Sequence, residues 1–342
     1  MLVDTTKHVS NYDKFFKSIY FKNYVFLRKD FCKWTDKIGK INDLDWWISI
    51  PASRNYNFSN LYHYFCLIES FKQIKKRYIT KIIVDSHEFK NILRKNLKIN
   101  VQIQVKNKQK NSILKNFFII SKHFIFYLII FFFSNLDKKK ISSNSDLVLI
   151  DTFLEETNIK KNRFYSDNFL EQVNQKNNIF FVPSFYMGMG FIKVIKSITN
   201  CKKSKIFLLK ERYLKFNDIL KSLFLIFRRK KFKKNYIKLK NIDYAKFIYE
   251  EINSNQNLSS QILGWQNFLF FKNIKNSKIK IRKTINWFEN QSLDKGWNFG
   301  VRTFFPKAKC FGYQGFTCFP QYMCLNPTKF EYSAKVVPEV IL

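Results

Sequence analysis

The sequence of 342 residues lacks the short motifs that identify the common nucleotide-binding and hydrolytic enzymes. It contains no Gly-x-Gly-x-x-Gly fingerprint, no phosphate-binding loop, no Gly-x-Ser-x-Gly turn and no metalloprotease helix. Gly188-Met-Gly190 has only two glycines, and it indicates the start of a helix rather than a nucleotide site. None of the enzyme classes that these motifs identify is supported.

Cysteine and histidine are present but are not spaced as metal ligands. The six cysteines stand at 32, 66, 201, 310, 318 and 324 without any Cys-x-x-Cys pair, and the four histidines are scattered. This excludes the usual zinc modules and gives no disulfide framework, so reduced thiols in a cytosolic protein are expected. We therefore expect no metal and no bound cofactor.

Acidic residues are scarce. Only 25 Asp and Glu oppose 61 Lys and Arg, which gives a formal net charge of +36 at pH 7. Such a field favours polyanions, namely nucleic acid, anionic lipid or phosphate-bearing substrates. AT-rich codons for Lys, Asn, Ile and Phe are an equally good explanation of much of this excess.

The chain also lacks an apolar signal-peptide core at Met1–His8 and has no Gly/Ser-rich or Pro-rich linker. We therefore expect a cytoplasmic protein with one α/β domain. Its expected boundaries are an N-terminal extension over residues 1–40, a Rossmann-like domain over 41–330 with a membrane-facing helical insertion at about 112–137, and the start of a further domain over 331–342.

Short apolar runs that alternate with helical patterns predict a mostly parallel sheet with helices on both faces. Helices are predicted near 60–77 and 88–95. The predicted strands cover residues 45–50, 81–85, 101–105, 146–151, 178–183, 205–209, 278–288 and 309–312.

Polar residues follow most of these runs. In a parallel sheet the carboxyl ends of the strands share one edge, so the sequence predicts a common ligand crevice there. The alternative for any single residue is a solvated loop. The residues placed at this edge are Arg54, Asp85, His87, Asp151, Thr152, Ser184, Glu289, Asn290, Gln291, Tyr313 and Gln314.

Two apolar stretches are bordered by basic residues. Ile113–Phe133 lies between Lys106, Lys108 and Lys110 on one side and Lys138–Lys140 on the other, and Ile219–Phe227 precedes Arg228–Lys234. Such helices are typical of interfacial anchors on an anionic membrane, and Lys115 and Lys122 make a spanning helix costly. We expect a peripheral position on the inner face of the cytoplasmic membrane. Ordinary core helices with solvated lysines are the alternative.

The C-terminal segments Trp287-Phe-Glu-Asn-Gln291, Asp294-Lys-Gly-Trp-Asn-Phe-Gly300 and Gly312-Tyr-Gln-Gly-Phe316 carry the most specific pattern. Together with Asp45-Trp-Trp and Pro51–Asn55 they resemble proteins of bacterial surface-carbohydrate biosynthesis, the capsule and lipopolysaccharide pathways. The resembled proteins look like glycosyltransferases with two Rossmann-like halves (the GT-B type). The resemblance covers most of the chain from about residue 45.

The resemblance implies that an acceptor binds the N-terminal half and a nucleotide-sugar donor mainly the C-terminal half. The chain stops where that second half would begin, so it is expected to be truncated and incomplete alone. A separate chain that supplies the missing half is then a possible partner. The acceptor would be a glycan or a lipid-linked sugar, and the nucleotide sugar a co-substrate.

Sugar transfer needs a base for the acceptor hydroxyl and positive charge for the leaving diphosphate. Glu289 is the leading candidate for the base, with Asp85 and His87 behind it. Arg54 and Lys295 are candidates for phosphate contacts. The candidates for sugar binding are Asp151, Thr152, Asn290, Gln291, Tyr313, Gln314 and Gly315.

Two other readings stay open. A non-catalytic membrane-associated binding or assembly subunit of the same pathway needs no second half. A basic nucleic-acid-binding protein ranks third. Basic runs mixed with aromatic residues can bind single-stranded nucleic acid, but the sequence contains no recognised RNA- or DNA-binding motif.

Overall fold

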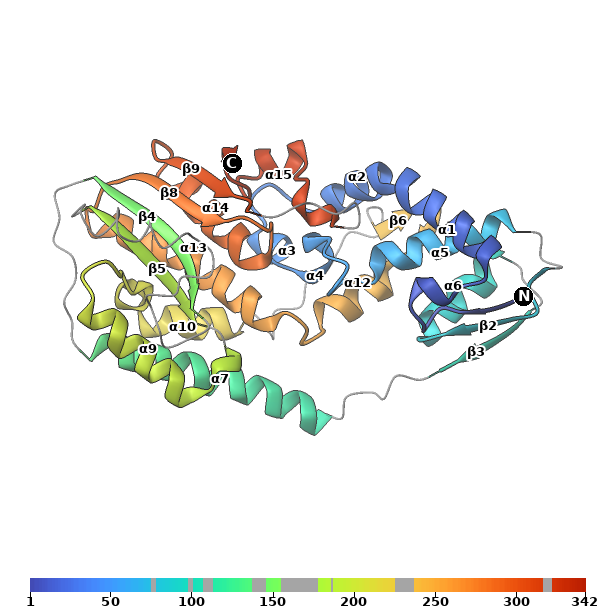
Figure 1. The fold of residues 1–342 in the computed structure, drawn as a ribbon, viewed down its shortest axis with the longest axis horizontal. Helices are drawn as coiled ribbons and strands as arrows, with labels where there is room; N and C mark the ends of the chain where they lie inside the picture. The colour runs from blue at the N-terminus through green and yellow to red at the C-terminus, as the bar shows by residue number, and fades with distance from the viewer. Residues whose placement is uncertain are drawn as a thin grey trace.

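The computed structural model describes residues 1–74, 78–97, 101–106, 113–136, 146–154, 178–185, 187–224, 237–315 and 322–342. It is an α/β protein with two parallel sheets rather than the single sheet expected. The sheets lie towards opposite ends of the long axis of the molecule (Figure 1).

The first sheet is parallel and has the order β1-β2-β3, with β1 Leu2–Asp4, β2 Lys81–Val84 and β3 Gln102–Val105. Residues 1–40, expected as an extension, therefore belong to this unit, because β1 pairs with β2. A two-stranded hairpin of β6 Lys238–Leu239 and β7 Ile242–Asp243 lies in the same hydrophobic core. The helices of this unit are α1 Lys14–Phe26, α2 Arg28–Ile38, α5 Leu61–Gln73, α6 His87–Leu97 and α12 Ala245–Ile252.

The second sheet is parallel and has the order β10-β9-β8-β4-β5. Its strands are β4 Leu147–Leu154, β5 Ile179–Phe185, β8 Ile281–Trp287, β9 Lys309–Tyr313 and β10 Val340–Ile341. Its helices are α7 Ile113–Asn135, α9 Phe191–Lys203, α10 Phe216–Leu223, α13 Leu258–Asn276, α14 Ser292–Phe304 and α15 Lys329–Ser333. Short 3-10 turns lie at Val9–Asn11, Met187–Met189, Lys210–Tyr213 and Met323–Leu325.

The central pair of this unit is α13 and α14, whose backbones touch. A Cβ atom on Gly296 would lie 1.9 Å from the carbonyl oxygen of Gly264, and one on Gly264 would lie 2.5 Å from the carbonyl oxygen of Ser292. Only glycine allows helices to approach so closely. The contact fixes the start of α14, and with it the loop that follows β8.

Two short helices, α3 Leu44–Trp47 and α4 Ile50–Ser53, lie between the sheets (Figure 1). The indole N–H of Trp265 on α13 donates to Asp45 Oδ1 at 2.9 Å. The Ser292 hydroxyl donates to the carbonyl oxygen of Ile48 at 2.7 Å. The two units are therefore joined by one partly buried and one buried hydrogen bond, and Phe288 and Phe299 extend the first unit's core into the second.

Two sequence predictions of strands are wrong. Residues 45–50 form helical turns instead of a strand, because Asp43 accepts from the backbone N–H of Trp46 and starts α3. Residues 205–209 form only one bridge, Phe181 to Phe207. Within residues 331–342, expected to begin a further domain, Val340–Ile341 forms β10 at the edge of the second sheet.

The predicted interfacial stretches correspond to helices α7 and α10 of the second unit. Within the described chain, only Phe117–Asn135 is long and apolar enough to cross a membrane, and 28% of that window is buried. In the second stretch Ile219 and Leu223 are buried in the core. Lys108, Lys110, Lys138–Lys140 and Arg228–Lys234 lie outside the described residues.

Candidate functional site

The carboxyl ends of β8 and β9 present an aromatic pair beside a carboxylate. The rings of Trp287 and Tyr313 are 5.5 Å apart and tilted. The Trp287 indole N–H donates to Glu289 Oε1 at 2.9 Å, which orients the carboxylate. Glu289 is partly exposed, and Tyr313 is 39% exposed. We refer to Trp287, Glu289 and Tyr313 as the aromatic–carboxylate site.

Gly315 shapes this site from the end of β9. A Cβ atom there would come within 2.7 Å of the Tyr313 ring and 2.9 Å of the Trp287 ring. A residue without a side chain is therefore needed here for the backbone to pass this close to both rings. The backbone N–H of Gln314 donates to the carbonyl oxygen of Leu342, so its main chain is held by the edge strand.

The loop between β8 and α14 is held by Asp294. One oxygen of this buried carboxylate accepts from the backbone N–H of Glu289 at 3.1 Å and of Gln291 at 3.0 Å. Asn290, between them, adopts the left-handed conformation with φ 55°. Gln291 is the N-cap of α14. The position of Glu289 is thus fixed by the helix that follows it.

Buried ionisable groups lie behind this loop. Burial raises the pKa of Asp294 well above its usual value, and the nearby charges of Asp151 and Glu289 raise it further. Burial also raises the pKa of Asp151 to about 6, against the opposing effect of Lys210. Asp151 and Thr152 are both buried within β4, so they lie beneath the surface of the predicted crevice.

Sequence reasoning missed Lys210. This fully buried ammonium donates to Ser184 Oγ at 2.7 Å and to Asn267 Oδ1 at 2.8 Å, and burial lowers its pKa. A signal was present, because Lys210 and Glu211 interrupt an apolar run that begins at Ile206. Both side chains are buried, which a charged pair tolerates only with partners.

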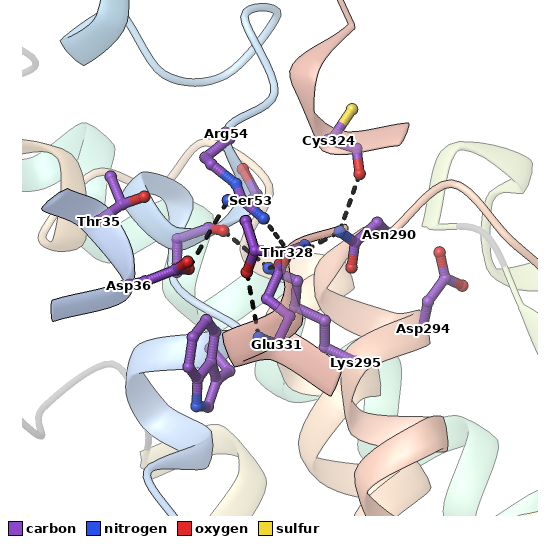
Figure 2. Close-up of polar contacts among 12 residues, drawn as sticks. Thr35, Asp36, Ser53, Arg54, Asn290, Asp294, Lys295, Cys324, Thr328 and Glu331 are labelled. Carbon is purple, nitrogen blue, oxygen red and sulfur yellow. Dashed lines mark hydrogen bonds and ion pairs between the residues drawn. The ribbon is translucent and has the colours of Figure 1, made fainter. Parts of the chain in front are cut away.

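A buried ionic cluster lies beside the loop and joins both ends of the chain (Figure 2). Glu331 pairs with Arg54 through one oxygen and with Lys295 Nζ at 3.0 Å through the other. Arg54 also lies 3.7 Å from Asp36. We refer to Asp36, Arg54, Lys295 and Glu331 as the buried ionic cluster.

Backbone and amide groups complete the cluster. Lys295 Nζ donates to the carbonyl oxygen of Ala52 at 2.7 Å. Asn290 Nδ2 donates to Glu331 Oε1 at 3.2 Å and to the carbonyl oxygen of Cys324 at 2.8 Å (Figure 2). Burial opposes ionisation of Glu331, but the cations of Arg54 and Lys295 outweigh it and lower its pKa to about 2.

The cluster changes the roles expected for its members. Arg54 and Lys295, predicted to meet phosphate, are buried and face Glu331, and Asn290 is equally buried. Sequence reasoning missed Asp36 and Glu331 as their partners. The signal for Glu331 was the capping box Thr328-x-x-Glu331 at the start of α15.

Asp85 and His87 do not join the other predicted residues. They follow β2 of the first sheet, and the Tyr64 hydroxyl donates to Asp85 Oδ2 at 2.6 Å. The prediction of one shared edge for Arg54, Asp85, Asp151, Glu289 and Gln314 is therefore wrong in part. It fails because the strands separate into two sheets, which strand spacing alone does not reveal.

No group of three or more His, Cys, Asp or Glu side chains in the described chain is arranged to hold a metal ion. The comparisons give no family for this chain: a scan against protein-family models, a search of curated proteins and a search of solved structures each found no match.

Proposed function

We propose that this chain is a glycosyltransferase-like protein of surface-polysaccharide biosynthesis and that it holds an acceptor sugar at the aromatic–carboxylate site. The observation that carries the proposal is the Trp287–Tyr313 ring pair beside the oriented, partly exposed Glu289 carboxylate. A sugar has apolar C–H faces and hydroxyl groups around its edge. An aromatic ring can pack against the C–H face, and an adjacent carboxylate can accept hydrogen bonds from the hydroxyls.

The same carboxylate is placed for general-base chemistry. In transfer, Glu289 would take the proton of the acceptor hydroxyl while that oxygen forms a bond to the anomeric carbon. The bond from this carbon to the diphosphate of the nucleotide sugar breaks, and the diphosphate leaves with the electron pair. The hydrogen bonds that Asp294 accepts from the loop backbone support this role, since a fixed base loses little entropy in reaction.

The fold is compatible with this proposal at a coarse level. Parallel α/β sheets bind ligands at the carboxyl ends of their strands, and the aromatic–carboxylate site lies at the ends of β8 and β9. The finer assignment, that the chain contains the acceptor half of a GT-B enzyme, rests on the sequence resemblance. It is part of the proposal.

A second candidate is a non-catalytic sugar-binding subunit of the same pathway. It is favoured by the buried ionic cluster, because Arg54 and Lys295 neutralise an internal carboxylate instead of facing a leaving diphosphate. Transfer needs positive charge at the leaving group, whereas binding does not.

One set of measurements separates these functions. Saturation-transfer NMR with a panel of glycans and lipid-linked sugars measures binding, and a panel of radiolabelled nucleotide sugars measures turnover. Tyr313→Ala should abolish sugar binding, while Tyr78→Ala, at an exposed tyrosine of the first unit, should leave it unchanged. The absence of any sugar binding by the wild-type chain would refute both candidates.

Glu289→Gln then distinguishes the two. If the chain is a transferase, this variant should retain sugar binding and lose turnover by about 10²–10⁴-fold. If it is a binding subunit, the wild type binds sugar without turning over any donor, and Glu289→Gln changes affinity alone.

A further inference from the structure

The second unit exposes an apolar face on α7, α9 and α10. Large apolar side chains, which a soluble protein normally buries in its core, are 46% to 72% exposed on or beside these helices. They are Phe117, Phe118, Ile125, Phe132 and Leu136 on or beside α7, Ile192 on α9 and Phe216 on α10. We refer to this set as the outer apolar face. A face of this kind marks an interaction site.

The outer apolar face is continuous from helix to helix. The ring of Phe216 lies 6.2 Å from that of Phe131 and 6.4 Å from that of Phe132. Beneath the surface α9 packs against α7, since the buried ring of Phe126 lies 6.1 Å from the partly exposed ring of Phe191. Figure 1 shows the three helices together along one side of the second sheet.

The charges around this face are of one sign. Lys122, Lys193, Lys196, Lys203, Lys215 and Lys221 are exposed on or next to the three helices. The only acidic residue within α7, α9 and α10 is Asp218, which is buried and accepts from the Lys215 backbone N–H and from Asn273 Nδ2. An apolar surface ringed by cations complements a surface that is apolar within and anionic at its rim.

The inner side of α7 is bound to the protein. The Tyr127 hydroxyl lies 2.6 Å from Ser259 Oγ, and Arg212 Nε donates to the carbonyl oxygen of Ser134 at 3.1 Å. Asn135 Nδ2 donates to the carbonyl oxygen of Glu211. A helix that crossed a bilayer would leave these groups unpaired, so α7 lies along the protein with one side outward.

We propose that the outer apolar face docks on an anionic lipid bilayer, with its phenylalanines and isoleucines in the boundary between headgroups and acyl chains and its lysines at the level of the lipid phosphates. The proposal is independent of the sugar site. Lipid is favoured over a protein partner because the apolar patch and the exclusively cationic rim occur on the same helices.

Flotation of the purified chain with vesicles tests this docking. Vesicles of phosphatidylcholine with phosphatidylglycerol should carry the protein upward, and salt should weaken the binding. Phosphatidylcholine alone should carry much less. Equal binding to both vesicle types at low and high salt would overturn the proposal.

Matched variants locate the contact. Phe118→Glu combined with Ile192→Glu should lower the affinity for anionic vesicles more than about tenfold, since both side chains would have to leave the lipid. Phe26→Glu, at an equally exposed phenylalanine on α1, should not change it. Lys193→Gln with Lys196→Gln should lower affinity by about fivefold per lysine, and Lys29→Gln with Lys33→Gln on α2 should not.

Two results would contradict the assignment even if vesicles bind. Equal losses in the α9 and α2 lysine variants would show nonspecific charge attraction. Resistance of membrane-bound protein to alkaline carbonate extraction, with α7 protected from protease, would show a spanning helix instead of docking. Because the substituted side chains are exposed, circular dichroism should show unchanged folding in every variant.

Discussion

Arg54 and Glu331 are separated by 277 positions in the chain and form a fully buried ion pair. Arg54 ends α4 in the left-handed conformation, with φ 52°, which a non-glycine residue adopts only at a cost. Glu331 is held by its place in the first turn of α15. The pair therefore connects the region between the sheets to the C-terminal helix.

Glu331→Gln should destabilise the protein by about 3–5 kcal/mol, because it leaves the buried Lys295 ammonium without its paired carboxylate and the buried Arg54 guanidinium with Asp36 alone. Urea unfolding followed by circular dichroism measures the change. As a control, Glu88→Gln breaks an exposed bridge to Lys246 and should cost less than about 1 kcal/mol. Similar losses in the two variants would show that burial of the pair adds nothing to its importance.

Asp151→Asn should flatten the pH dependence of stability between about pH 4 and 6. The folded pKa of Asp151 is about 6, above its unfolded value of roughly 3.9, so folding retains a proton that the unfolded chain releases. Its contribution is fully present below pH 4 and is lost as pH rises through 6. The difference between the folded and unfolded pKa values of Asp151 corresponds to about 3 kcal/mol of stability.

Unfolding free energies of wild type and Asp151→Asn across this pH range provide the test. Asp30→Asn, at an exposed site on α2, is the matched control and should follow the wild type. A residual slope is expected in every variant, because burial also raises the pKa of Glu251 to about 7. An unchanged slope in Asp151→Asn would contradict the prediction.

Gly296→Ala should destabilise the protein by more than about 3 kcal/mol. The added methyl would meet the backbone of Gly264, which cannot rotate away as a side chain can. Asn276→Ala at the exposed end of α13 should change stability by less than about 0.5 kcal/mol. Thermal unfolding of both variants measures the difference, and a mild effect at Gly296 would mean that the two helices can separate.

Trp287→Phe should retain an aromatic ring at the proposed sugar site but remove the hydrogen bond to Glu289. Loss of one hydrogen bond to a charged group costs about 1.5–3 kcal/mol, so sugar affinity should fall roughly 10- to 100-fold. Isothermal titration with the best glycan measures this, and Trp265→Phe serves as a control for indole removal elsewhere. Unaltered affinity would show that the orientation of the carboxylate is unimportant.

The sequence predicted individual elements well where they are apolar and regular. The strands at 81–85, 146–151 and 178–183 and the helix near 60–77 are confirmed within a few residues. The arrangement of the strands was harder to predict, because residues 5–80 separate β1 from β2 and no local sequence feature marks their pairing. For the same reason the sequence did not reveal that Asp85 and Glu289 follow strands of different sheets.

The candidate site was foreseen in part. Glu289 and Tyr313, both predicted at strand ends, each contact Trp287, whereas Arg54, Asn290 and Lys295 are buried. A charged residue is normally predicted to lie in solvent, because a buried partner cannot be recognised from the local sequence. Here that partner, Glu331, lies far along the chain. Composition alone could not identify that pair.

The separation of Arg54 and Glu331 also has a consequence for biosynthesis. Ribosomes release a chain from its N-terminus, so the guanidinium of Arg54 exists for 277 further rounds of peptide synthesis before its main counter-ion is made. Until then only Asp36 can offset its charge within the cluster. The junction between the sheets must therefore close late, after the first sheet has already received its strands.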